Sequence, residues 1–260
     1  MDLSPTPHPD VNEILDLLLQ NVSGILKDQL VGMYLFGSLA NGDFDQDSDI
    51  DVLVVTDTIL SSNSFNALKE MHERITRIHS PWAIQMEVSY IPKEALRRQD
   101  PSNNQHPHMD RGNGEILHIM QHDSDWIIQR HILHEHGITV TGPDPKSLID
   151  PVSSENLKWA ATDILNGWIK GFLEAPHILQ NRGYQSYTVL TLCRILHTLE
   201  YGTVVSKPVA AEWAIRTLPL EWHPLIERAW FGRRNPSQKT VANELDDTLN
   251  FIRYTLESRK

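Results

Sequence analysis

Residues 36–51, FGSLANGDFDQDSDID, join two stretches of apolar sequence. The first is LVGMYLF at 30–36. The second is DIDVLVVT at 49–56, which begins with two aspartates and is then almost entirely aliphatic. An apolar run that ends in Gly37-Ser38 predicts a strand that opens into a helix N-terminus. There a glycine lets backbone amides approach an anion, and the serine hydroxyl adds a hydrogen-bond donor. We therefore predict that Gly37 and Ser38 form a phosphate-binding turn.

Asp49 and Asp51 stand two residues apart at the start of the next strand. Because side chains alternate along a strand, both carboxylates face the same side while Ile50 points into the core. Two adjacent carboxylates repel each other away from water, and a hard divalent cation such as Mg²⁺ relieves that repulsion. A pair of this kind in isolation is more often a solvated turn. Beside a phosphate-binding turn, however, it predicts a metal and a nucleoside triphosphate together.

A third carboxylate, Glu87, lies in the run AIQMEVSYI at 83–91, which predicts another strand. An ionised side chain between Met86 and Val88 is costly to bury without a partner. If this strand neighbours the previous one, Glu87 comes to lie beside Asp49 and Asp51. It can then either bind a metal or accept the proton of an attacking hydroxyl.

The remaining pattern of the first half predicts a small α/β sheet unit. The segment DPSNNQHPHMDRGNG at 100–114 is rich in Pro, Asn, His and Gly and predicts a long loop, with His106 and His108 in contact with solvent. Apolar spacing predicts helices after Pro9 as far as Ile25, at 65–78 and around 126–133, and strands at 30–36, 49–56 and 83–91.

The second half predicts helices only. Three prolines within 142–154 indicate a joint between domains. Helical spacing follows at 157–173, 187–201, 208–218, 222–231 and 239–256. The fold class is therefore α/β followed by all-α, with a small mixed sheet and its helices in a domain at 1–150 and a helical bundle in a domain at 151–260.

The composition narrows the partners and the compartment. The chain carries 23 Lys and Arg against 34 Asp and Glu, a formal net charge of −11, which disfavours nucleic acid and favours a cationic small molecule. No apolar run reaches the roughly 18 residues of a membrane span. A single cysteine, Cys193, excludes an intramolecular disulfide and a multi-thiolate zinc site. The first residues show no secretory signal, so we expect a cytoplasmic protein.

The string from Gly37-Ser38 to Asp49-Ile50-Asp51, followed by an aliphatic run and a third acidic strand, resembles the nucleotidyltransferase superfamily that includes DNA polymerase beta. The resemblance implies that residues 1–150 are the nucleotidyltransferase domain. It also implies that the two aspartates bind magnesium, that the Gly-Ser turn holds the β- and γ-phosphates, and that Glu87 completes the site.

The resemblance extends to the aminoglycoside adenylyltransferases of the streptomycin and spectinomycin class. It is carried by VLTLCRILHTLEYGTVVSKPVAAEWAI at 189–215 and LPLEWHPLIERAW at 218–230. It implies that Lys207 reaches the phosphates of ATP, with Arg194 in the preceding helix, and that Trp230 and Asp125 lie close to the nucleotide. Each of these residues also has a purely structural interpretation, as a helix start, an ion pair or a core side chain.

Two departures from the family affect the acceptor. The family members that modify streptomycin use a tryptophan after the third strand and acidic residues before the helix at 189. The segment GNGEILH at 112–118 contains no Trp, and HILQNRGYQSY at 177–187 contains no Asp or Glu. Spectinomycin is therefore favoured over streptomycin as the acceptor.

The expected function is that of a magnesium-dependent enzyme transferring AMP from ATP to a hydroxyl of an aminoglycoside or aminocyclitol. Asp49 and Asp51 hold magnesium, with two ions expected, Ser38 and Ser48 orient the triphosphate, and Glu87 activates the acceptor. The helical domain closes over nucleotide and acceptor, and one chain suffices, so we expect a monomer. The alternatives are AMP transfer to a protein, a tRNA or another metabolite, and a nucleotide-binding module without catalysis.

Overall fold

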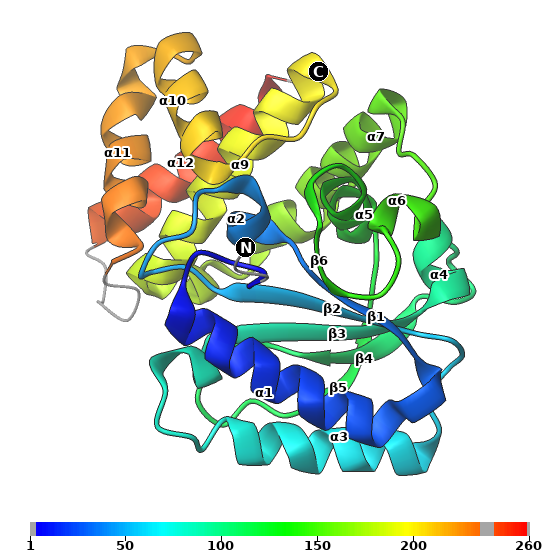
Figure 1. Cartoon of the computed structure of the whole chain (residues 1–260). Helices are drawn as coiled ribbons and strands as arrows, with labels where there is room; N and C mark the ends of the chain where they lie inside the picture. Colours follow the sequence, from blue (N-terminus) through cyan, green and yellow to red (C-terminus); the bar gives the residue numbers. More distant parts are fainter. Residues whose placement is uncertain (1–3, 235–241, 259–260) are drawn as a thin grey trace. The chain divides into compact units, whose positions relative to one another are not determined.

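The computed structural model describes residues 4–234 and 242–258. The chain divides into two compact units, Met1–Pro151 and Val152–Lys260 (Figure 1). Unit 1 contains a sheet and its helices, and unit 2 is helical. The start of the helix expected at 239–256 falls outside the described residues.

The described part of unit 1 contains a six-stranded mixed sheet with the order β5-β4-β3-β2-β1-β6. β2 and β3 run parallel, and every other neighbouring pair is antiparallel. The strands are β1 Leu30–Leu35, β2 Ile50–Thr56, β3 Met86–Pro92, β4 Gln105–Met109, β5 His118–Gln121 and β6 Ile138–Thr141. The adjacency of β2 and β3 decides the site, because it joins the strand of Asp51 to the strand of Glu87.

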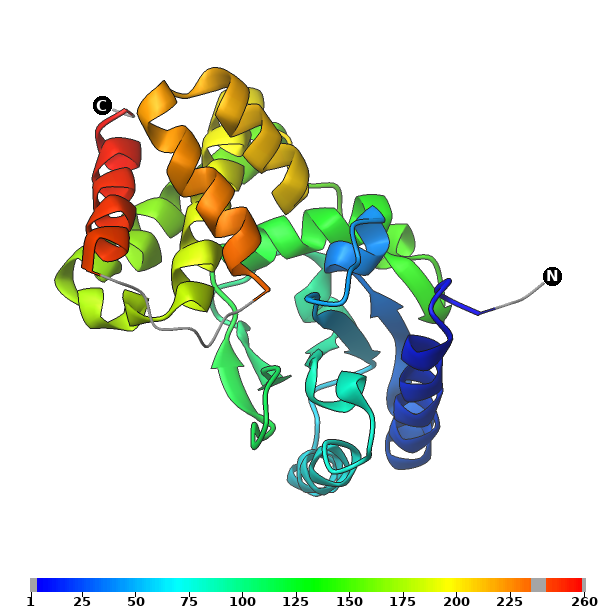
Figure 2. The same ribbon diagram turned by 90° about the vertical axis from the view of Figure 1, so that its left-hand side faces the viewer.

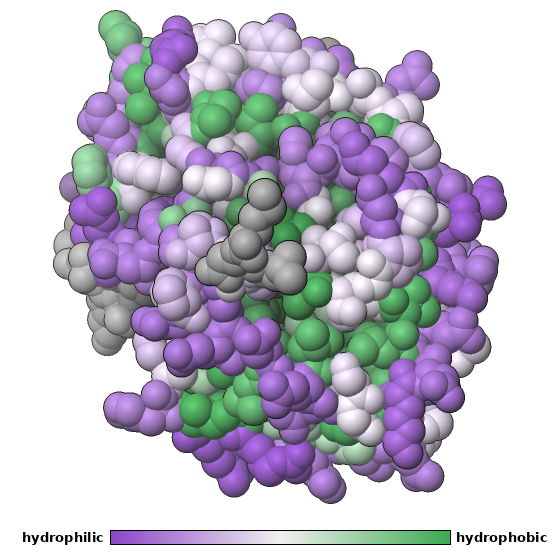
Figure 3. Space-filling view, in the orientation of Figure 1, coloured by the Kyte–Doolittle hydropathy of each residue, from purple (hydrophilic) through white to green (hydrophobic). Residues whose placement is uncertain are grey.

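Two amphipathic helices, α1 (Pro9–Leu26) and α3 (Ser62–Ile75), pack side by side against the sheet (Figure 1). α1 buries one apolar stripe, and α3 begins where the Ser61 Oγ accepts a hydrogen bond from the Ser64 amide at 3.1 Å. The side of α3 that faces away from the sheet is hydrophilic. Figure 3 shows hydrophilic side chains at the position that α3 has in Figure 1. These helices and the buried strand residues form the core of unit 1.

The prediction of a loop at 100–114 is wrong, because strand β4 lies within this segment. His106 and His108, expected in contact with solvent, are each 2% exposed. Pro107 hid the strand from the sequence pattern. Pro107 lies opposite Ile119 of β5, and the pairing of β4 with β3 covers only His108 and Met109, so no ladder bond to β3 requires a Pro107 amide. Strands β5 and β6 were also not expected, since each is only four residues long.

β3 begins at Met86 rather than at residue 83, because a 3₁₀ turn, Pro81–Ile84, precedes it. The Ser80 side chain caps that turn by accepting a hydrogen bond from the Trp82 amide at 3.3 Å. Unit 1 also contains the short helices α2 (Gly37–Asn41), α4 (Lys93–Arg97) and α6 (Pro145–Leu148), and the longer α5 (Asp125–His136).

A buried histidine in this core makes unit 1 sensitive to acid. His72 of α3 is 1% exposed, and its Nε2 lies 2.7 Å from the Tyr90 hydroxyl of β3. Burial lowers the pKa of His72 to about 4. His122 follows the same direction, because burial, followed by the nearby His106 and His108, lowers its pKa to about 2. Both rings are therefore neutral in the folded protein and become charged on unfolding in mild acid.

We expect the free energy of unfolding to fall as the pH drops below about 6.5, where the unfolded chain takes up protons that folded His72 cannot accept. His72 alone accounts for about 2 kcal/mol between about pH 7 and about pH 5. Urea titrations at both pH values check this. The loss should shrink by that amount in His72→Gln and stay unchanged in His79→Gln, which alters an exposed histidine. An equal acid loss in all three proteins would contradict the assignment.

Unit 2 is built around the long helix α9 (Arg182–Tyr201), which contacts α7 (Ser154–Ile164), α10 (Lys207–Thr217), α11 (His223–Gly232) and α12 (Ala242–Glu257) (Figure 2). Cys193 is fully buried in the core that these helices share. Gly202 ends α9 with φ 68°, and its amide donates to the Thr198 carbonyl at 2.7 Å.

The helix expected at 157–173 is instead three segments: α7, a π-helical turn at Leu165–Ile169 that contains Gly167, and α8 (Lys170–Glu174). The predicted fold class, a mixed sheet with helices followed by a helical bundle, is confirmed. No helix among the described residues is long and apolar enough to cross a membrane.

Candidate active site

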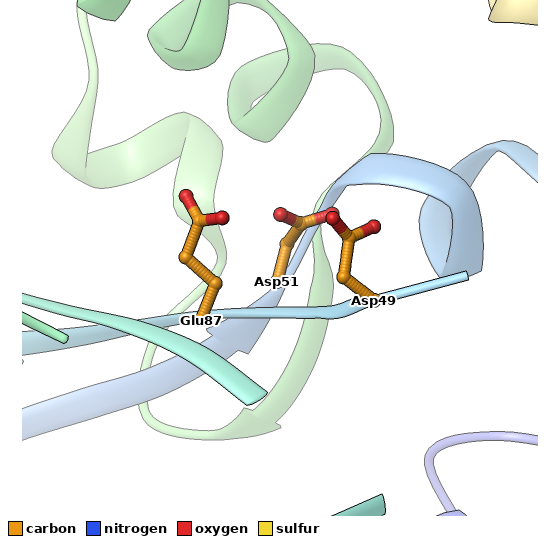
Figure 4. Close-up of side chains that lie close together, drawn as sticks. All are labelled: Asp49, Asp51 and Glu87. Carbon is orange, nitrogen blue, oxygen red and sulfur yellow. The ribbon is translucent and has the colours of Figure 1, made fainter. Parts of the chain in front are cut away.

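Three carboxylates meet where β2 and β3 begin. The parallel register places Asp51 directly opposite Glu87, and Asp49 immediately precedes β2. One carboxylate oxygen from each of Asp49, Asp51 and Glu87 lies within 4.8 Å of the other two, and Figure 4 shows the three groups converging. The sequence predicted this juxtaposition on the condition that the two strands are neighbours, and they are.

The cluster carries strong mutual repulsion. Burial, then the negative charges of Asp51, Asp49 and Asp110, raise the pKa of Glu87 to about 8, and the positive charge of Arg111 acts against them. Titratable groups perturbed in this way are typical of functional sites. Three hard oxygen donors at this spacing fit a divalent cation such as Mg²⁺, which would offset the repulsion and hold Glu87 in its ionised form.

The turn at Gly37 is built against this cluster. Gly37 has φ 62°, and the Phe36 amide donates to the Asp51 carbonyl at 3.2 Å, which ties the turn to β2. The Ser38 Oγ is buried and has no hydrogen-bond partner among residues 4–234 and 242–258. A buried hydroxyl without a partner is costly unless a ligand satisfies it, which fits the predicted contact with phosphate.

We expect Gly37→Ala to damage the site through Asp51. A Cβ at Gly37 would overlap the Asp51 carboxylate, coming within 2.7 Å of its Cγ, so the carboxylate must shift. A misplacement of about 1 Å lowers turnover by about a hundredfold. Gly42→Ala is the matched control, because Gly42 also has a positive φ, 74°, but has no atom within 4 Å of a Cβ. Turnover and thermal unfolding of both variants check this, and equal turnover in the two would contradict it.

Two other predicted residues of unit 1 lie outside the carboxylate cluster. The Ser48 hydroxyl is 3.0 Å from the Asp45 carboxylate and accepts a hydrogen bond from the Asp45 amide, so it closes the turn before β2. Asp125 is exposed at the start of α5. A role for either residue toward the nucleotide stays a prediction.

The remaining predicted residues lie in unit 2, on three successive helices: Arg194 in α9, Lys207 at the start of α10 and Trp230 in α11. The Lys207 Nζ lies 5.4 Å from the centre of the Tyr187 ring. The Arg233 guanidinium lies 4.3 Å from the centre of the Trp230 ring. The nucleotide contacts expected of these residues stay predictions.

Sequence reasoning missed three groups beside the cluster. The His108 Nε2 lies 3.9 Å from a Glu87 oxygen and 3.4 Å from an Asp110 oxygen, and the Arg111 Nη1 lies 3.4 Å from an Asp49 oxygen. Ser89, two residues after Glu87 on β3, fixes the His108 ring through a 2.8 Å contact with Nδ1. The alternation of His106, His108 and Asp110 at period two is the signal that could have identified this strand.

Comparison with known proteins covers both units. Residues 15–104 match the family described as nucleotidyltransferase domain, and residues 147–258 match aminoglycoside adenylyltransferase, C-terminal domain. The spectinomycin 9-adenylyltransferase of Staphylococcus aureus is 31% identical over 223 residues, 83% of this chain and 82% of that protein. The spectinomycin 9-adenylyltransferase of Campylobacter jejuni is 28% identical and covers 99% of this chain and 98% of its own length.

A more distant relative is the aminoglycoside (3'') (9) adenylyltransferase of Escherichia coli, 25% identical with 88% of each chain covered. Among solved structures, the spectinomycin adenyltransferase AAD(9) from Enterococcus faecialis with ATP and spectinomycin shares the fold. Its TM-score is 0.72 at 20% identity, over 94% of this chain and 98% of that one.

The sheet, the carboxylate cluster and these matches define a nucleotidyltransferase with a helical C-terminal domain. The chain belongs to the aminoglycoside adenylyltransferase family. Both steps of the resemblance drawn from the sequence are thereby confirmed, as is the prediction of an enzyme that transfers AMP.

Proposed function

We propose that this enzyme transfers AMP from ATP, with Mg²⁺, to a hydroxyl of an aminocyclitol antibiotic of the spectinomycin type. The convergence of Asp49, Asp51 and Glu87 within 4.8 Å carries the proposal, because this donor set suits both a metal–triphosphate complex and the activation of a hydroxyl. The named relatives support the reaction and the acceptor.

In the proposed mechanism, Asp49 and Asp51 would hold the metal. The Gly37 turn and the Ser38 hydroxyl bind the β- and γ-phosphates of ATP. The metal, as one ion or two, supplies positive charge to the triphosphate. Glu87 accepts the proton of the acceptor hydroxyl if it is not fully engaged as a metal ligand. The hydroxyl oxygen forms a bond to the α-phosphorus of ATP, and the bond from that phosphorus to the bridging oxygen breaks, releasing pyrophosphate.

Unit 2 completes the proposal for the nucleotide. Arg194 and Lys207 of this unit supply positive charge for the phosphates, and Trp230 contacts the nucleoside together with Asp125 of unit 1. We propose that the helical unit closes over nucleotide and acceptor. The three carboxylates come from one chain, which supports a monomer. The proposed use of ATP supports a cytoplasmic location.

The choice of acceptor rests on the net charge of the chain, on residues missing from two segments and on the named relatives. A net charge of −11 favours a cationic acceptor. The segments 112–118 and 177–187 lack the tryptophan and the carboxylates expected for streptomycin. Relatives named for spectinomycin match this chain at 31% and 28% identity.

To test this, the purified chain is incubated with Mg²⁺, ATP and one drug at a time: spectinomycin, streptomycin or another aminoglycoside. Mass spectrometry then measures the molecular mass of each drug. We expect spectinomycin to gain one adenylyl group and streptomycin to stay unmodified. Adenylylation of streptomycin alone would overturn the choice of acceptor. If no drug is modified while the chain binds magnesium and ATP, the acceptor is instead a protein, a tRNA or another metabolite.

A further inference from the structure

Arg111 has no part in the mechanism above, yet it lies against the carboxylate cluster. Its Nη1 is 3.4 Å from the Asp49 Oδ2, with side chains 45% and 23% exposed. Its positive charge also acts on Glu87, where it favours the ionised form. The Arg111 guanidinium therefore lies against the oxygens assigned to a metal and partly neutralises their charge.

The backbone around Arg111 is held on both sides. Before it, β4 pairs with β3 through Met109 and Val88. After it, the Gly112 amide donates a hydrogen bond to the Ile84 carbonyl at 2.8 Å, and Gly112 has φ 140°, a conformation that disfavours other residues. The guanidinium can therefore change partner by rotation of its own side chain, without rearrangement of the sheet.

Metal binding at Asp49 favours such a change. A divalent cation on Asp49 weakens the ion pair with Arg111, because the two positive charges repel each other in the same small space. The triphosphate then places anionic oxygens beside the metal. An arginine fork matches a phosphate in both charge and shape, and its hydrogen bonds to phosphate are among the strong ones.

We propose that Arg111 is a phosphate-binding residue that exchanges partners: it pairs with Asp49 in the metal-free enzyme and with the triphosphate once Asp49 binds the metal. This inference rests on the proposed function, since it takes Asp49 as a ligand of the metal–triphosphate complex. Arg111 therefore competes with the free metal for the Asp49 carboxylate and binds the phosphates of the bound nucleotide.

The two roles give effects of opposite sign, which a merely structural residue would not produce. Arg111→Gln should bind Mn²⁺ alone about three- to tenfold more tightly than the unmodified enzyme, because the competing charge is gone. The same variant should bind α,β-methylene-ATP with Mg²⁺ about tenfold more weakly, because a charged hydrogen-bond donor to the phosphates is lost. Arg111→Lys should fall between the two proteins in both measurements. Calorimetry on the full chain measures both affinities.

Arg77→Gln is the matched control, since it removes one positive charge from an exposed position that follows α3 and should leave both affinities unchanged. The proposal is overturned if both affinities of Arg111→Gln move in the same direction, or if neither moves, while the unmodified enzyme binds both ligands. If the unmodified enzyme binds neither Mn²⁺ nor the ATP analogue, the proposed function itself fails.

Discussion

Asp49→Asn should lower AMP transfer by on the order of a thousandfold while leaving the fold intact. The substitution keeps the shape of the side chain but removes one of the two negative charges that would anchor the metal, and with it the charge that stabilises the reacting triphosphate. Asp49 is partly exposed at the start of β2, and its side chain is outside the apolar core of unit 1. The loss should therefore appear in turnover and in metal binding, and hardly in thermal unfolding.

The matched control for Asp49→Asn is Asp57→Asn, at the far end of the same strand. Asp57 pairs with Lys93 at 2.6 Å in a half-exposed ion pair, so its loss should change stability little. Single-turnover transfer with saturating ATP compares the two variants. Transfer by Asp49→Asn at the rate of the control would remove Asp49 from the site.

Glu87→Gln separates the two roles that remain open for Glu87. If Glu87 accepts the proton of the acceptor, the variant should bind Mg²⁺ and α,β-methylene-ATP within about threefold of the unmodified enzyme and transfer AMP about a thousandfold more slowly. Glutamine occupies nearly the same volume but cannot accept the proton. Binding and transfer measured on the same preparation check the result, with Glu94→Gln as an exposed control. Equal losses of binding and transfer would make Glu87 primarily a metal ligand.

The carboxylate cluster was predictable from sequence because it depends on two local rules and one pairing. Residues at i and i+2 of a strand share a face, which aligned Asp49 with Asp51. The pairing of β2 with β3 then brought Glu87 to the same rung as Asp51. Most of the longer helices followed from apolar spacing, because each must bury one stripe, but the same spacing missed the π-helical turn that divides 157–173.

The surroundings of the cluster were not predictable in the same way. Short strands carry little periodic signal, and Pro107 within β4 indicated a loop, although the partial pairing with β3 leaves no ladder bond on that side for a Pro107 amide to make. Once β4 was missed, the positions of His108, Asp110 and Arg111 beside Glu87 and Asp49 could not be inferred. Contacts across a sheet depend on strand order, which the sequence of one chain specifies only weakly.

The most direct test of the central claim measures pyrophosphate released from Mg²⁺–ATP by the purified chain, with and without spectinomycin, beside Asp49→Asn. We expect release that requires the drug and that is lost in Asp49→Asn, because transfer to the drug hydroxyl and metal binding at Asp49 are parts of one reaction. Two results would contradict this expectation: pyrophosphate release by Asp49→Asn at the rate of the unmodified enzyme, or release by the unmodified enzyme at the same rate with and without the drug.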